Sequence, residues 1–141
     1  MRSGLHPSKP RGFDLLTRIV IVHQAFALVV LGSGLSSLLA KGIGLHVLST
    51  GAGLLIAIAS AVAMFGVAKR KSLPALAWLR VLLWAGVVRG AFSVLTLFGT
   101  SDASIAAFVR SMILNEGILI PLAIYWTRAV HSRYLASLRA A

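Results

Sequence analysis

Arg89 and Glu116 are the residues of this sequence whose types and positions best suit chemistry inside a membrane. Arg89 lies within an apolar run from Ala75 to Phe98, and Glu116 within another from Ile105 to Trp126. Arg89 comes about 15 residues after Pro74, which places it roughly 22 Å along a helix. A charge at that depth needs a partner, so we expect Arg89 to pair with the Glu116 carboxylate.

Pro121 suggests a second acceptor for the same cation. Its ring has no N–H and clashes with the carbonyl four residues earlier, which belongs to Gly117. We therefore expect a helix kink at which the Arg89 guanidinium bridges the Glu116 carboxylate and the Gly117 carbonyl, with Asn115 adjacent. Two interpretations stay open: a structural clamp that fixes the helix register, or a transport site beside a broken helix.

The remaining polar residues give weaker signals. His23 and Gln24 early in the first apolar run suit either a proton relay or a hydrogen-bonded helix contact, whereas Arg80 is expected to reach the headgroups. His46 falls at the opposite surface and His131 near the end of the chain, so we expect no metal site. The chain has three acidic residues, no Cys and no catalytic motif, so we expect neither an enzyme nor a cofactor.

The elements that position these residues follow from composition. Of the 141 residues, 58% are hydrophobic and 12% are charged, which indicates a membrane protein. A bilayer core about 30 Å thick needs roughly 20 apolar residues of helix. Four runs meet this length without the alternation of a membrane barrel: residues 19–39, 45–68, 75–98 and 105–126. Because the connections are short, the sequence predicts an all-α, antiparallel up-down-up-down four-helix bundle.

The charge distribution predicts the orientation. The formal net charge is +11, and the basic residues gather before the first run, between the second and third, and after the fourth. This pattern predicts an inner-membrane protein with both termini in the cytoplasm, a basic leader over residues 1–18, a membrane domain over 19–127 and a basic tail over 128–141. Without an aromatic and basic platform, nucleic-acid binding is not expected. Anionic lipid headgroups are the expected partners of six basic residues: Lys69, Arg70, Lys71, Arg128, Arg133 and Arg139.

Small residues recur at helical spacing within the apolar runs. Such residues let helix backbones approach closely in lipid, and they mark either internal contacts or contacts with a second copy or another membrane protein. The pairs are Gly32 and Ser36, Gly53 and Ala57, and Gly86 and Gly90.

Two stretches resemble a known family. MFGVAKRKSLPALAWL (64–79) and IPLAIYWTRAVHSRYL (120–135) are similar to the basic turn and the last helix with its basic tail in small bacterial four-helix membrane proteins, the family of domain of unknown function 2569. Thr127-Arg128-Ala129-Val130 stands where that family has a Ser-Lys-Arg-Val type motif. The resemblance implies four helices, cytoplasmic termini and no assigned activity.

The sequence thus favours a structural or accessory role, as a partner subunit or a self-associating protein with Arg89 and Glu116 as its clamp. The alternative is a small oligomeric transporter, or a proton-coupled permeation unit, that uses this pair and the Pro121 kink.

Overall fold

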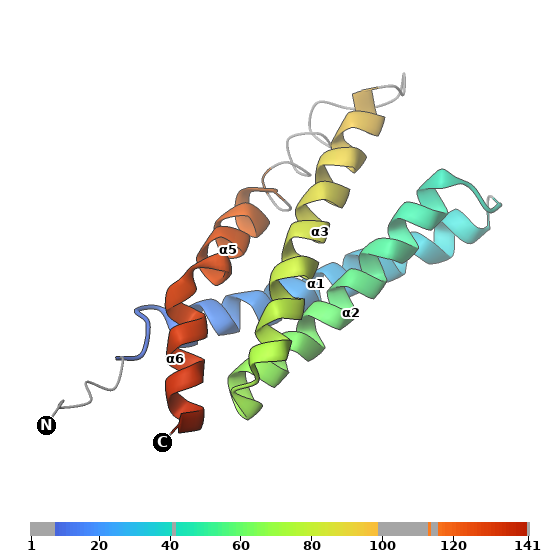
Figure 1. Ribbon diagram of the computed structural model, residues 1–141. Helices are drawn as coiled ribbons and strands as arrows, with labels where there is room; N and C mark the ends of the chain where they lie inside the picture. Colours follow the sequence, from blue (N-terminus) through green and yellow to red (C-terminus); the bar gives the residue numbers. More distant parts are fainter. Residues whose placement is uncertain (1–7, 41, 99–112, 114–115, 141) are drawn as a thin grey trace, which may run out of the picture.

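The described part of the chain is entirely helical. The computed structural model describes residues 8–40, 42–98, 113 and 116–140, and no strand occurs among them. The helices are α1 (Phe13–Leu39), α2 (Leu45–Arg70), α3 (Leu73–Phe98), α5 (Gly117–Thr127) and α6 (Ala129–Ala140) (Figure 1). Helices α1 to α3 are long and apolar enough to span a membrane, over Phe13–Ser36, Val47–Arg70 and Leu73–Ser93, which agrees with the predicted all-α membrane class. Helix α5 is apolar but shorter.

The helices contact one another in chain order. Helix α2 packs against α1 and α3, and α3 packs against α5 and α6. Helices α1 and α2 run side by side, and α3 is inclined to both. The distance between this pair and α3 therefore increases away from the α2–α3 turn (Figure 1).

The hydrophobic core lies at the end of the molecule that holds the α2–α3 turn and α6, which we call the basic end. There Phe13 at the start of α1 makes edge-to-face contacts with Trp126 and Tyr134, with ring centroids 5.2 and 5.6 Å apart. The Tyr125 hydroxyl donates to the Arg11 carbonyl at 2.9 Å. The start of α1 and the junction of α5 and α6 therefore lie together. The other core residues include Val20, Met64, Val67, Leu76, Leu79, Leu83 and Leu122.

The turn between α2 and α3 is tight and fully capped. Lys71 is left-handed, with φ of 50°, and the Ser72 N–H donates to the Gly66 carbonyl at 3.2 Å, which closes the end of α2. The Ser72 hydroxyl accepts from the Ala75 N–H at 3.3 Å, and Pro74 lies in the first turn of α3, as expected from its missing donor.

Two helical segments extend beyond the predicted spans. Helix α1 begins at Phe13, inside the stretch expected to be a leader, because Phe13 and Thr17 are buried against the rest of the basic end. The expected tail contains helix α6, whose His131 and Leu135 are completely buried. Packing of isolated apolar and aromatic side chains, rather than a continuous apolar run, thus holds these segments in place.

Candidate functional site

Arg89 lines a small cavity between the helices. The cavity, about 20 Å³ in volume, is lined by residues of four helices, among them His23 and Gln24 of α1, Gly53 of α2, Gly86 and Arg89 of α3, and Leu119 of α5. A space of this size holds about one water molecule. The Arg89 side chain is half-buried and thus reaches the interior of the helix array.

Glycine makes room for the guanidinium. A Cβ atom built on Gly53 would lie 3.0 Å from both Cζ and Nε of Arg89, so the absence of a side chain at Gly53 admits the cation. Across the cavity, a Cβ on Gly86 would lie 3.5 Å from a methyl group of Leu119. Ala57 and Gly90 are also buried. These four small residues therefore lie at contacts between helices.

The other predicted packing pair lies elsewhere. Gly32 and Ser36 are exposed on α1, and no described atom lies within 4 Å of a Cβ built on Gly32. The Ser36 hydroxyl donates to the Ser33 carbonyl of its own helix at 2.9 Å. Within the described residues, this face of α1 has no covering helix.

His23 and Gln24 join the Arg89 cavity. Gln24 is 4% exposed, and its Nε2 lies 3.4 Å from Nδ1 of His23. The sequence alone does not group these residues with Arg89, because the rotation of α1 about its axis decides which face meets α3. Their shared polarity inside an apolar run was the signal for grouping them.

Glu116 is buried but does not contact Arg89 directly. It is 8% exposed, and its Oε1 has no hydrogen-bond partner within the described part of the chain. No ion pair within 4.0 Å joins Glu116 to Arg89, although the two charges attract each other. The expected bridge from Arg89 to Glu116 and the Gly117 carbonyl is therefore not formed here, because the guanidinium turns toward the space at Gly53. Asn115 lies outside the described residues.

The helix break is not at Pro121. Helix α5 runs through Pro121 without interruption, whereas Ile113 and Glu116 ahead of it lie in wider π-helical turns. A wide turn before proline removes the need for a sharp kink at the ring. The chain instead breaks at Arg128, which is extended with φ of −61° and ψ of 137°.

Arg80 holds this break together, a role that the sequence analysis missed. Its Nε donates to the Trp126 carbonyl at 2.8 Å, and its Nη2 donates to the Arg128 carbonyl at 3.1 Å and to the Ser132 hydroxyl at 2.8 Å. The sequence predicted only that Arg80 can reach the headgroups; in the structure its guanidinium binds acceptors at the junction of α5 and α6. The nearby Trp84 indole donates to the Thr127 hydroxyl at 3.0 Å.

His131 lies in an aromatic cluster beside the same break. It is 0% exposed, and its ring lies 4.4 Å from that of Tyr125 and 5.0 Å from that of Trp126, centroid to centroid. Nδ1 lies 3.1 Å from the Arg128 carbonyl, and Nε2 is buried without a described partner. Burial lowers the pKa of His131, and the nearby Arg80 and Arg128 charges lower it further, against the effect of the carbonyl. The sequence signal was the spacing of His131 and Leu135, which places both on one face of α6.

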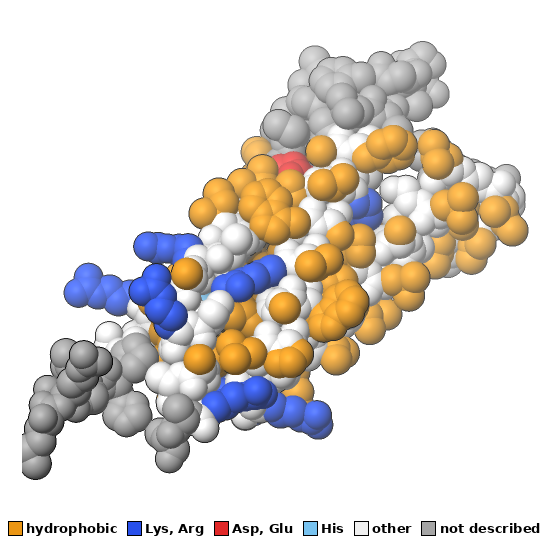
Figure 2. Space-filling view, viewed as in Figure 1, with side chains coloured by type: hydrophobic (Ala, Val, Ile, Leu, Met, Phe, Trp, Pro, Cys, Tyr) orange, Lys and Arg blue, Asp and Glu red, His pale blue; other side chains and the backbone are white. Residues whose placement is uncertain are grey.

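The basic residues gather at the basic end (Figure 2). Lys69, Arg70, Arg128, Arg133 and Arg139 are exposed there. Lys71 differs, because its Nζ donates to the Ala68 carbonyl at 2.6 Å and lies 5.5 Å from the centre of the Phe13 ring. A search of the described residues gives no group of three or more His, Asp or Glu side chains that could hold a metal ion.

Chemically, the site is a small polar pocket that can order a water molecule and stabilise a charge. Comparison with known proteins adds no relative: no family model matches the chain, and no curated protein or solved structure matches it significantly.

Proposed function

We propose that this protein is a small four-span inner-membrane protein with both termini in the cytoplasm and a structural or accessory role, binding a second copy or a partner subunit. The orientation rests on the basic end, where both the start of α1 and helix α6 lie among the exposed Lys and Arg residues. The fourth crossing would comprise residues 105–126, of which α5 forms the last part.

One face of the far half of α1, which no described helix covers, carries this proposal. Near the basic end, the exposed face of α1 presents bulky side chains such as Val22, Phe26 and Val29, which suit lipid tails. Further along, the same face presents Gly32, Ser33 and Ser36. Small residues give little contact with lipid but allow another helix to approach closely, so this half of α1 suits a helix partner.

Cysteine cross-linking in the membrane tests self-association. The chain has no native Cys, so an introduced cysteine is the sole source of a disulfide. We expect Ser36→Cys to give a covalent dimer under mild oxidation, and Ala52→Cys, exposed on α2, to give none. A photo-activatable residue at position 36 extends the test to other proteins. Cross-links at position 36 to lipid alone would contradict the proposal.

A second candidate function is proton-coupled or ion-coupled permeation through the region of Arg89 and Glu116. The buried Oε1 of Glu116, which has no hydrogen-bond partner among the described residues, favours it, because an ionisable group inside a membrane domain often marks a transport path. His23, Gln24 and Arg89 supply further polar atoms around the cavity.

A charge-exchange cycle separates the roles of this pair. Arg89→Glu, Glu116→Arg and the double variant are compared by the amount of folded protein in the membrane. If the charges stabilise the fold through their attraction, each single variant accumulates less and the double variant recovers. If all three accumulate normally, the charges do not hold the fold, and flux across vesicles that contain the purified protein becomes the deciding measurement.

A further inference from the structure

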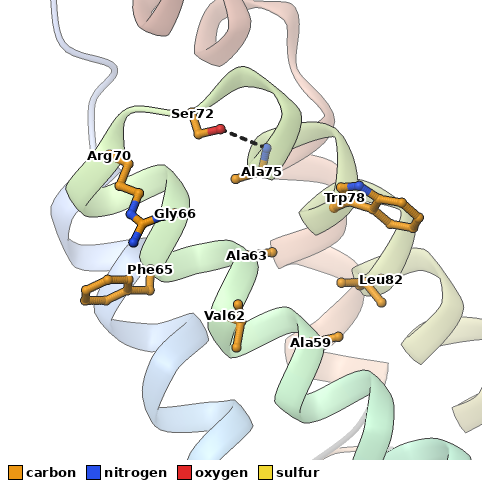
Figure 3. A pocket seen from close by; sticks show the side chains of 10 residues that line it. All are labelled: Ala59, Val62, Ala63, Phe65, Gly66, Arg70, Ser72, Ala75, Trp78 and Leu82. Atoms are coloured by element: carbon orange, nitrogen blue, oxygen red, sulfur yellow. Dashed lines mark hydrogen bonds between the residues drawn. The ribbon is translucent and has the colours of Figure 1, made fainter.

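An apolar groove runs along the outside of α2 and α3 near the basic end. It has a cavity volume of about 570 Å³, within the range of roughly 300–1,000 Å³ typical of ligand clefts. We call it the α2–α3 groove, and its apolar lining includes Ala59, Val62, Phe65, Ala75, Trp78 and Leu82. Small residues form its floor, while Phe65 and Trp78 stand on its two sides (Figure 3).

The groove ends at a cation. Arg70 and Ser72 line it near the α2–α3 turn, and the Arg70 side chain extends back along α2 beside Gly66 and Phe65 (Figure 3). None of the hydrogen bonds and ion pairs between described residues uses the Arg70 guanidinium. The Ser72 hydroxyl accepts from the Ala75 N–H, so its own proton remains available for an acceptor. With Lys69 adjacent, this end of the groove is suited to an anion.

The length of the groove identifies its occupant. From Ala59 to Arg70, α2 rises about 16 Å, which matches one leaflet, half of a hydrocarbon core about 30 Å thick. An extended lipid acyl chain also occupies one leaflet, so its length matches that of the groove. The cation lies at the end of the groove where the headgroup of such a lipid would lie.

We propose that the α2–α3 groove binds one acyl chain of an anionic phospholipid, whose phosphate is held by the Arg70 guanidinium and the Ser72 hydroxyl. Arginine presents a planar fork of donors that matches two phosphate oxygens. Basic pockets between membrane helices at the cytoplasmic side are suited to such headgroups. This site requires that the helices span a membrane, but it does not depend on the association of α1 with a partner.

Native mass spectrometry of the full chain tests the site, with phosphatidylglycerol and phosphatidylcholine of identical acyl chains as probes. We expect phosphatidylglycerol to bind at least about tenfold more tightly, because the choline cation of phosphatidylcholine offsets the attraction of its phosphate to Arg70. This ratio corresponds to about 1.4 kcal/mol of binding free energy. Arg70→Gln should abolish this preference, and Arg70→Lys should retain part of it. Arg133→Gln, which removes the same charge from an exposed site on α6, should leave it unchanged.

A second pair of variants tests the groove itself. Ala59→Phe should fill the groove and reduce binding of both lipids, whereas Ala91→Phe, at an exposed position further along α3, should not. Equal affinity for the two lipids would overturn the proposal, because Arg70 would then give no preference for an anionic headgroup. Equal losses in Arg70→Gln and Arg133→Gln would overturn it in favour of a diffuse charge effect. Loss of a protein dimer in Ala59→Phe with unchanged lipid binding would instead identify a protein as the occupant.

Discussion

Arg80 of α3 lies beside the end of α5, and its guanidinium donates to two backbone carbonyls and one hydroxyl at the junction of α5 and α6. Three of its hydrogen bonds cross from α3 to Trp126, Arg128 and Ser132. Hydrogen bonds that involve a charged group contribute about 1.5–3 kcal/mol each when a partner is removed. The junction of α5 and α6 therefore depends more on this one cation than on the local sequence.

We expect Arg80→Gln to lower the free energy of unfolding by about 1.5–3 kcal/mol, because one amide cannot reach all three acceptors. Denaturant titration in detergent micelles, followed by circular dichroism, measures the change. Trp84→Phe, which removes a single neutral hydrogen bond, should cost about 0.5–1.5 kcal/mol. A loss for Arg80→Gln no greater than that for Arg133→Gln would show that Arg80 is not the junction's main support.

His131 makes the basic end sensitive to acid. Burial holds its pKa below the ordinary value of about 6.5, so the folded protein keeps the ring neutral where the unfolded chain takes up a proton. Stability is therefore full above about pH 6.5 and is lost as the pH falls from there through the lowered pKa. We expect the melting temperature in detergent to fall between pH 7 and pH 5.

The variant His131→Phe should remove most of this pH dependence, since phenylalanine also places an aromatic ring at this position but cannot be protonated. His46→Gln, at the opposite end of α2, should leave the decline in melting temperature unchanged. A decline of the same size in His131→Phe and in the parent protein would mean that another group takes up the proton.

At the scale of helices, α2 and α3 approach each other closely at Gly66. A Cβ built there would lie 2.8 Å from the Cβ of Ala75, a distance that requires the two backbones to move apart. Overpacking of this kind typically costs about 1–3 kcal/mol. The higher helix propensity of alanine returns about 1 kcal/mol of that cost.

Gly66→Ala should therefore destabilise the protein by on the order of 1 kcal/mol, the difference of these two effects. Ala75→Gly in the same chain removes the opposing methyl group and should restore part of the stability. Gly51→Ala, where no described atom lies within 4 Å, should be neutral or slightly stabilising. Equal denaturation midpoints for Gly66→Ala and Gly51→Ala would contradict the close contact.

The apolar runs predicted the long helices well, because hydropathy and length depend on composition alone. Helix α2 begins at Leu45 and α3 ends at Phe98, as the runs do. The direction of the Arg89 side chain could not be predicted, since it depends on how α1 and α2 are rotated and on the space at Gly53. The same holds for Arg80 and His131, whose partners lie on other helices and are brought near by packing.

At the scale of the molecule, stability is concentrated at one end. The fully buried side chains, such as Met64, Leu76 and Trp126, lie at the basic end, whereas α1 and α2 diverge from α3 beyond it (Figure 1). The divergent half contains the Gly32 and Ser36 face, which no described helix covers. A well-packed basic end and a divergent half with an exposed small-residue face are consistent with the proposed binding of a partner in the membrane.

This arrangement also yields a prediction about the two ends of the sequence. Phe13 and Tyr134 are in contact, so the start of α1 and helix α6 lie at the same end of the molecule, and the proposed orientation puts that end, with its surrounding Lys and Arg, in the cytoplasm. We expect a fluorescent protein to be active, and alkaline phosphatase inactive, when fused to either end. Because an even number of crossings returns the chain to its starting side, opposite reporter results at the two ends would mean that residues 105–126 do not cross the membrane.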